Sequence, residues 1–559
     1  MNFFGLIIIS TLMVISSLVM KATSESATAH YGSPSFSASE NKKLNILAAL
    51  FTSSGSHFTF FKPLLEELAR RGHNLTVLSY NPRKNNTMDT KILHNYKDVL
   101  LTDPKLITRN VVNVEKMVSN SYFINMGKFF RLRELGLKYC EMTFNNTEVR
   151  ELIKSDQRFD LIFMETFSTD CALGFVHRFQ APFIALSSHE IMPWINDRLG
   201  NPDNPSYIPE FFKLYSGQMR FMQRVMNTLG LWWAKFIYEI AFQCPNQKLV
   251  EDTFGPEVPP LSEIAKKTSA LLVNTHYSIH GSRPYVPNVI EVGGMHIGEP
   301  KPLPDDIQKF LDNARKGALL FSWGSMVNTS TLTQKKLDAL LNVFEKMPRK
   351  VILKWEYDEF PRKMKNVMIK KWLPQFDIMN HPNVKAYLSH GGLLGLSEGV
   401  YVGIPMVIVP MYGDQFHNAA AAAARGAAVI VRYDELDEIT LKSALDKVFN
   451  DTRYQENARA LSRAYRDRPA SPLETAVWWS EFIARGNGRP YLRSEGADLP
   501  WYQYYLLDVF LFLTVILLTA FYATYRLMKF LLFLCCFRKS CKTTESSSAI
   551  GKKTKRKNE

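Results

Sequence analysis

The side chains best suited to chemistry gather in one part of the chain, residues 371–418. An apolar segment at residues 384–388 is typical of a buried strand, and Ser389, His390 and two glycines separate it from an apolar helical segment. Glycines at such a junction let a ligand approach the backbone, and the N-terminus of the following helix presents unpaired N–H groups to an anion. His390 adds a donor at the same place. The arrangement predicts a diphosphate site, although it lacks the glycine spacing of a dinucleotide fingerprint or a Walker loop.

The whole of residues 371–418 resembles the signature of the UDP-glycosyltransferases, inverting enzymes of the GT-B fold that include the membrane-bound glucuronosyltransferases. The resemblance covers essentially the whole chain and is greatest to the arthropod membrane-bound branch. It implies a UDP-sugar donor as co-substrate, no further cofactor, and a small lipophilic acceptor. Because arthropod relatives favour glucose over glucuronic acid, we expect glucose to be the transferred hexose.

The same resemblance implies roles for individual side chains of the donor site. An aromatic plane suits a base, a carboxylate suits vicinal hydroxyls, and an amide beside a carboxylate suits a polyol. The implied residues are Trp372, stacked on uracil, Gln375 and Glu398 at the nucleoside and ribose, Ser325, His390 and Gly392 at the diphosphate, and Asp414 and Gln415 at the sugar. Many family members have Asn where this chain has Leu394, so we assign no phosphate contact to Leu394.

A general base is expected at His57, which lies between the first apolar strand and a helical segment and matches the catalytic histidine of the family. A neutral imidazole, with a pKa of about 6.5, takes up a hydroxyl proton at neutral pH. The family pairs this histidine with an acidic residue, which falls here within residues 159–170. A gapless register places Glu165 there, but we favour Asp170, which lies past the strand end where a loop can reach the imidazole. The expected reaction is a single displacement that inverts the anomeric carbon.

Two other functions fit parts of the same sequence. Gly395 to Gly399 match G-x-S-x-G, the nucleophile motif of serine hydrolases, but they lie in the same loop–helix unit as the other glycines rather than directly after a strand. A catalytically silent binder of hydrophobic ligands would keep the same fold. No Asp-x-Asp pair occurs in the chain, so we expect no metal requirement.

Alternating strand and helix patterns must position these residues. Short apolar segments alternate with helical segments, as in parallel sheets built of strand–helix–strand units. The predicted strands are residues 45–50, 75–80, 160–164 and 183–186 in a first series, and 270–273, 319–323, 351–355, 384–388, 406–409 and 429–431 in a second. We expect an α/β fold of the GT-B type, with two facing doubly wound, Rossmann-like domains and ligands in the cleft between them. An acceptor-binding domain would span residues 40–285 and a UDP-sugar-binding domain residues 286–485, with final helices able to pack back on the first.

The two ends of the chain predict a membrane protein. Residues 1–24 have the apolar run of a signal peptide, and residues 505–527 are apolar enough for a transmembrane helix flanked by aromatic side chains. Residues 526–559 carry ten Lys and Arg against two Glu, so residues 528–559 are expected to form a basic cytosolic tail. The last five residues resemble a dilysine retrieval signal. We therefore expect a single-pass type I protein of the endoplasmic reticulum with lumenal catalytic domains, and leave homo-oligomers open.

Composition supports this interpretation. Of the net charge of +15, residues 526–559 supply +8 (ten minus two), which leaves +7 for residues 1–525 and removes the main argument for nucleic-acid binding. Hydrophobic residues make up 46% of the chain, which excludes a mainly disordered protein, and six cysteines are too few for a disulfide scaffold. The lumenal Cys140, Cys171 and Cys244 allow one disulfide, but we expect free thiols. An aromatic-rich segment at residues 207–242 predicts core packing, an acceptor pocket or a face on the lumenal leaflet.

Overall fold

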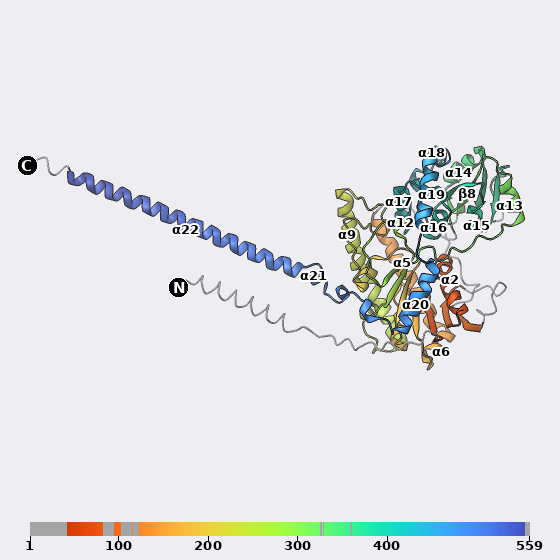
Figure 1. Ribbon diagram of the computed structural model, residues 1–559, viewed down its shortest axis with the longest axis horizontal. Helices are drawn as coiled ribbons and strands as arrows, with labels where there is room; N and C mark the ends of the chain where they lie inside the picture. Colours follow the sequence, from red (N-terminus) through yellow and green to blue (C-terminus); the bar gives the residue numbers. More distant parts are fainter. Residues whose placement is uncertain are drawn as a thin grey trace, which may run out of the picture. The chain divides into compact units, whose positions relative to one another are not determined.

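The computed structural model describes residues 42–81, 94–101, 115, 122–324, 327, 329–357 and 360–553 (Figure 1). The predicted signal peptide lies outside these residues. The described body contains two parallel sheets with helices between the strands.

The first sheet has seven parallel strands in the order β3-β2-β1-β4-β5-β6-β7. They are β1 (Asn45–Ala49), β2 (Asn74–Ser79), β3 (Tyr96–Leu100), β4 (Leu161–Glu165), β5 (Phe183–Ser187), β6 (Ala270–Val273) and β7 (Val289–Glu291). The strand order reverses between β1 and β4, which makes their carboxyl ends the switch point where such sheets bind ligands. Residues 270–273, which the sequence pattern placed in the second series, belong to this sheet, and β7 carries it past the boundary predicted at residue 285.

The second sheet has six parallel strands in the order β10-β9-β8-β11-β12-β13. They are β8 (Ala318–Ser322), β9 (Lys350–Lys354), β10 (Val367–Lys370), β11 (Val384–Ser389), β12 (Met406–Ile408) and β13 (Ala428–Ile430). Its order reverses between β8 and β11, so this half is doubly wound as well. The predicted pair of doubly wound domains is therefore confirmed.

Helices cover both faces of each sheet. In the first half these are α2 (Gly55–Arg70), α5 (Tyr122–Asn145), α6 (Thr147–Lys154), α7 (Leu173–Phe179), α8 (Pro193–Leu199), α9 (Phe221–Ile237), the π-helical turn η2 (Tyr238–Gln243), α10 (Cys244–Phe254), α11 (Leu261–Ala265) and α12 (Tyr277–His280). Successive β1 side chains point to opposite faces: Ile46 packs in a core with α2, and Leu47 in a core with α7 and α10. Strands buried on both faces must be apolar throughout, which explains the continuous apolar runs.

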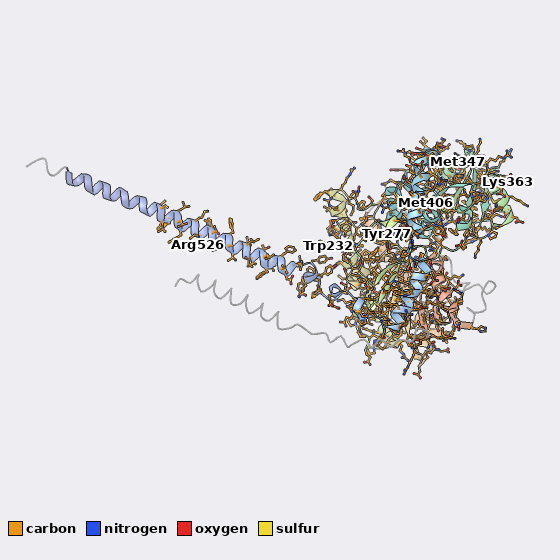
Figure 2. All side chains as sticks on the ribbon, in the orientation of Figure 1. Trp232, Tyr277, Met347, Lys363, Met406 and Arg526 are labelled. Carbon is orange, nitrogen blue, oxygen red and sulfur yellow. A yellow bond between two sulfur atoms is a disulfide. The ribbon has the colours of Figure 1, made fainter. Side chains whose placement is uncertain are left out.

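The helices of the second half are α13 (Asp305–Asp312), α14 (Gln334–Lys346), α15 (Gln375–Met379), α16 (Leu393–Val402), α17 (Gln415–Ala424), α18 (Glu438–Asn450), α19 (Thr452–Arg466) and α20 (Pro472–Arg485). Beyond them lie α21 (Trp501–Tyr504) and the long α22 (Leu507–Lys553). Residues 507–536 of α22 are long and apolar enough to cross a membrane. Arg526 is the first charged residue of α22 after Asp508 (Figure 2). The predicted membrane segment thus begins as a helix at Leu507, and the same helix continues to Lys553 in the predicted tail.

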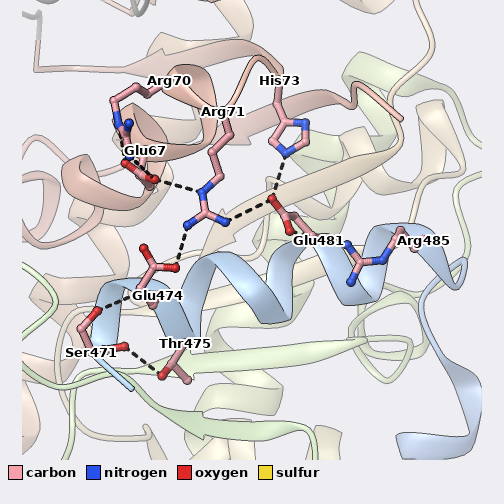
Figure 3. A network of polar contacts seen from close by, with 9 residues as sticks. All are labelled: Glu67, Arg70, Arg71, His73, Ser471, Glu474, Thr475, Glu481 and Arg485. Carbon is pink, nitrogen blue, oxygen red and sulfur yellow. Dashed lines mark hydrogen bonds and ion pairs between the residues drawn. The ribbon is translucent and has the colours of Figure 1, made fainter. Parts of the chain in front are cut away.

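Helix α20 returns to the first half and packs on α2 (Figure 3). Arg71, just past the end of α2, donates a hydrogen bond to Glu474 at 2.7 Å and lies 3.7 Å from Glu481. His73 Nε2 lies 3.3 Å from the same Glu481. Apolar side chains of α20, including Val477 and Ile483, enter the core beside β1. Helix α20, although it follows the second sheet in the chain, therefore packs on the half that contains the first sheet.

Cys140 in α5 and Cys171 in the loop before α7 form a disulfide, with 6.0 Å between their Cα atoms. The expectation of free thiols is wrong for this pair, because α5 packs against the loop that follows β4. Cys244 is exposed and unpaired. One bridge thus ties α5 to the loop beyond β4.

Candidate active site

His57 lies in the first turn of α2, where the chain has just left β1. Its partner is Glu165, the last residue of β4. Because β1 and β4 are paired, with Ala49 opposite Met164, the two segments leave the sheet side by side. Nδ1 of His57 lies 2.5 Å from Oε1 of Glu165, whose side chain is 3% exposed. An ionised Glu165 accepts a hydrogen bond from Nδ1–H and so leaves Nε2 as the unprotonated ring nitrogen, as a general base requires.

Asp170, the partner that we favoured from the sequence, lies elsewhere. Its buried carboxylate accepts hydrogen bonds from Arg198 at 2.8 Å, from the Tyr238 hydroxyl at 2.8 Å and from Gln243 at 2.7 Å. The chain has turned away from the sheet edge by this point, so Asp170 faces α8 and η2 rather than α2. The pairing of Asp170 with His57 is therefore wrong, and the gapless register that points to Glu165 describes the structure.

A second histidine beside His57 was missed from the sequence. His189 follows β5 by two residues, at the same carboxyl edge of the sheet, and the two imidazole centroids are 5.8 Å apart. Its Nδ1 lies 2.7 Å from the carbonyl oxygen of Glu190, while Nε2 has no partner among the described residues. Burial, followed by the nearby His57, lowers the pKa of His189 to about 3, so its ring is neutral. Its place after a predicted strand was the signal that could have identified it.

The glycines of the predicted diphosphate site make room for His390. A Cβ added at Gly392 would lie 2.4 Å from Nε2 of His390, and one at Gly324 would lie 2.8 Å from Cε1. Helix α16 begins directly after Gly392, so its N-terminal N–H groups lie next to the imidazole of His390. Burial and then Lys354 lower the pKa of His390 to about 4, so the ring is a neutral donor. Ser325, the other predicted phosphate ligand, lies outside the described residues.

The residues predicted at the nucleoside lie together at the start of α15 and along α16. Gln375 donates a hydrogen bond to Oε2 of Glu398 at 2.6 Å, and its own carbonyl oxygen accepts one from the Tyr387 hydroxyl at 3.1 Å. Burial raises the pKa of Glu398 to about 7, against the opposing effect of Gln375. Trp372, just after β10, is 68% exposed, which leaves its indole face available for stacking.

Asp414 and Gln415 lie at the start of α17 but are held differently. Asn418 donates a hydrogen bond to Oδ2 of Asp414 at 2.8 Å. Burial raises the pKa of Asp414 to about 6, while Asn418 and His57 act in the opposite direction. The side-chain oxygen of Gln415 accepts a hydrogen bond from the backbone N–H of Met411 at 2.9 Å. This oxygen is therefore occupied, and the side-chain NH₂ is the part of Gln415 that can donate to a ligand.

A buried cluster of charges connects the two halves next to these residues. Glu190, in the loop after β5, accepts a hydrogen bond from Arg283 at 2.6 Å and lies 2.8 Å from Nε2 of His417 in α17. Burial alone would raise the pKa of Glu190, but Arg283, His417 and His280 hold it well below its usual range. The contact between Glu190 and His417 therefore ties the helix that begins beside Asp414 to the half that carries His57.

The geometry does not support a serine hydrolase. Ser397 lies in the middle of α16, and the residue is 1% exposed rather than presented on a turn after a strand. Among the described residues, no group of three His, Cys, Asp or Glu side chains could hold a metal ion. The arrangement combines His57 and a buried carboxylate, the N-terminus of α16 next to His390, and the acidic side chains of Glu398 and Asp414.

Comparison with known proteins gives a consistent answer. The family model described as "UDP-glucoronosyl and UDP-glucosyl transferase" matches residues 47–543. The UDP-glycosyltransferase UGT5 of Dactylopius coccus is 38% identical over 85% of this chain and 90% of its own length. Human UDP-glucuronosyltransferase 2B15 is 32% identical over 90% of this chain and 94% of its own. Among solved structures, the calicheamicin glycosyltransferase CalG4 has a TM-score of 0.52 at 17% identity over 79% of this chain and 99% of its own, a likeness of fold alone.

Proposed function

The chain belongs to the UDP-glucuronosyl and UDP-glucosyl transferase family and is a UDP-glycosyltransferase, and from that premise we propose that it transfers glucose from a UDP-sugar to the hydroxyl group of a small lipophilic acceptor, with inversion. The observation that carries the proposal is the His57–Glu165 pair at the carboxyl edge of the first sheet. The contact between Glu190 and His417 joins this edge to α17, which begins beside Asp414, so the base of one half and the proposed sugar-binding carboxylate of the other lie on connected elements.

In the proposed reaction, Nε2 of His57 removes the acceptor hydroxyl proton. The acceptor oxygen forms a bond to the anomeric carbon while the bond from that carbon to the diphosphate breaks on the opposite side, and UDP leaves. Glu165 keeps the imidazole in the tautomer that can accept the proton and stabilises the imidazolium that forms. General-base catalysis of this kind contributes roughly 10²–10⁴-fold to a rate.

The departing diphosphate gains negative charge, and the proposed site offers hydrogen-bond donors for it. These are the N-terminal N–H groups of α16 and the neutral ring of His390. Fixed donors aimed at a developing charge stabilise it more than water does, because they need no reorganisation. Metal-assisted departure of the diphosphate is not part of the proposal, because the chain has no Asp-x-Asp pair.

The charges around the sugar-binding residues support a neutral hexose. Arg283 is bonded to Glu190, so this guanidinium is already committed to a carboxylate. Asp414 itself would repel the carboxylate of a glucuronate placed against it. These contacts favour glucose over glucuronic acid as the transferred sugar.

The proposed location follows from α22. Its apolar part is long enough to span a bilayer, and Lys and Arg dominate the sequence beyond it. Positive charge on the cytosolic side would place the two domains in the lumen of the endoplasmic reticulum, as a single-pass type I protein.

Purified membranes supplied with UDP-glucose or UDP-glucuronate and a panel of phenols and steroids test the proposal. We expect β-linked glucosides from the α-linked donor, identified by the coupling constant of the anomeric proton. Replacement of His57 by Ala should reduce transfer by roughly 10²–10⁴-fold while UDP still binds. Binding of UDP without transfer from either donor would instead favour a catalytically silent binder, and an α-linked product would exclude the inverting mechanism.

A further inference from the structure

Helix α9 presents an unusual outer surface. Six of its residues are exposed, and five of these are large and apolar. They are Phe221, Met222, Leu229, Trp232 and Phe236, exposed by 67%, 63%, 52%, 54% and 62%, and Arg224 is the sixth. Ile240, in the following η2 turn, is 54% exposed. A helix in contact with water normally carries charged side chains on its outer face, so this surface needs another explanation.

The apolar residues form one stripe along the helix. Met222, Leu229, Trp232 and Phe236 are separated by seven, three and four residues, which places them on one side of an α-helix. The opposite side, with Asn227, Gly230, Leu231 and Ala234, is buried against the first half. Helix α9 is therefore apolar on both sides, and only one side has a protein partner among the described residues.

The start of α22 lies next to this helix. Lys235 of α9 forms ion pairs with Asp197 at 2.6 Å and Asp203 at 2.7 Å. Burial alone would lower the pKa of Lys235, but these two carboxylates and then the Tyr505 hydroxyl raise it. Upstream of α21, a Cβ at Gly200, which caps α8, would lie 2.6 Å from the backbone nitrogen of Ala497. The segment that leads into α22 thus packs on α8, which contacts α9 and is joined to it by the Lys235–Asp197 ion pair.

This contact fixes where the membrane surface must be if α22 crosses the bilayer. Only Leu506 lies between Tyr505 and Leu507, where α22 begins, so these two residues are about 7 Å apart at most. Phe236 follows Lys235 directly, and Trp232 lies one helical turn before Phe236. The apolar stripe is then within reach of the lipid headgroups. The exposed Arg220 and Arg224 at its other end suit anionic lipids, and Trp is enriched at such interfaces.

We propose that the outer face of α9 is a membrane-contact surface, with Leu229, Trp232 and Phe236 inserted into the bilayer leaflet from which α22 emerges. The occupant is the lipid of that leaflet, and not a second copy of the chain, because the anchor holds α9 at the bilayer in every molecule. The proposal rests on α22 crossing the membrane and does not depend on the sugar or acceptor of the proposed function.

A photo-crosslinking experiment tests it on the full chain. The benzophenone amino acid p-benzoylphenylalanine replaces Trp232 or Phe236, both exposed aromatic positions where a ring is already present. The protein is placed in nanodiscs of phosphatidylcholine and phosphatidylserine and irradiated, and adducts are identified by mass spectrometry. Ile439 in α18, an apolar side chain that is 79% exposed in the second half, is the matched control. Phe521 in α22, 75% exposed, is the positive control for the anchor.

We expect lipid adducts at positions 232 and 236 at a level near that of position 521 and at least fivefold above that of position 439. Protein–protein adducts at 232 and 236 would overturn the proposal in favour of a second copy. Adducts at 521 but not at 232 or 236 would show that α9 stays in water. If position 521 also gives no lipid adduct, α22 does not cross the bilayer and the proposal fails at its premise, which leaves the proposed activity untouched.

Discussion

The partner of His57 can be tested by two amide substitutions that keep side-chain shape and remove charge. In Glu165→Gln, Nδ1 of His57 loses a buried carboxylate 2.5 Å away. A hydrogen bond to a charged group is worth about 1.5–3 kcal/mol, and 1.36 kcal/mol corresponds to a factor of ten in rate, so kcat/KM should fall roughly 10-fold to 150-fold. The KM for the UDP-sugar should hardly change, because Glu165 is bonded to the base rather than to the donor-binding side chains.

Asp170→Asn is the matched control. It removes the charge that faces the buried Arg198, and breaking a buried ion pair costs about 3–5 kcal/mol of folding stability. We therefore expect a lower melting temperature and a nearly normal kcat/KM for the folded fraction, determined by active-site titration. A Glu165→Gln enzyme within twofold of the parent would refute the reasoning. So would an Asp170→Asn enzyme with the larger loss of kcat at an unchanged melting temperature.

Three further predictions concern the donor site. Burial raises the pKa of Glu398 to about 7 and that of Asp414 to about 6, so both carboxyl groups become protonated as the pH falls from 8 to 5. The affinity for the UDP-sugar, measured by calorimetry, should therefore fall over that range. An affinity independent of pH would show that neither carboxylate binds the donor. Gly392→Ala places a Cβ against His390 and should abolish UDP binding. Gly298→Ala is the control, because a Cβ there has no atom within 4 Å, and it should leave UDP binding intact. Equal affinities of the two variants for UDP would show that Gly392 is not part of the site. Transfer should survive EDTA, and a loss rescued only by Mn²⁺ or Mg²⁺ would contradict this.

Much of the fold followed from the sequence, because strands buried on both faces must be apolar and their pattern is visible in the chain. The strands that were missed are β3, β7 and β10, which all lie at sheet edges, and β7 is only three residues long. Edge strands are less buried and so carry weaker apolar patterns: all four residues of β10 are only partly buried. Residues 270–273 were grouped with the second strand series although they fall inside the predicted first domain, because consecutive strands of two parallel sheets look alike in sequence.

The donor-site residues were predictable because they lie within one local stretch, in which short loops place Glu398, His390 and Asp414 on neighbouring elements. Contacts between distant segments were not. His57 is 108 positions from Glu165 and 113 from Asp170, and the first of these carboxylates ends β4 while the second follows it. The sequence by itself therefore predicted a base, an acidic partner and a diphosphate site. Which carboxylate meets the imidazole was decided by the parallel pairing of β1 with β4, which brings Glu165 to the edge beside α2, and by Arg198, which holds Asp170 away from it.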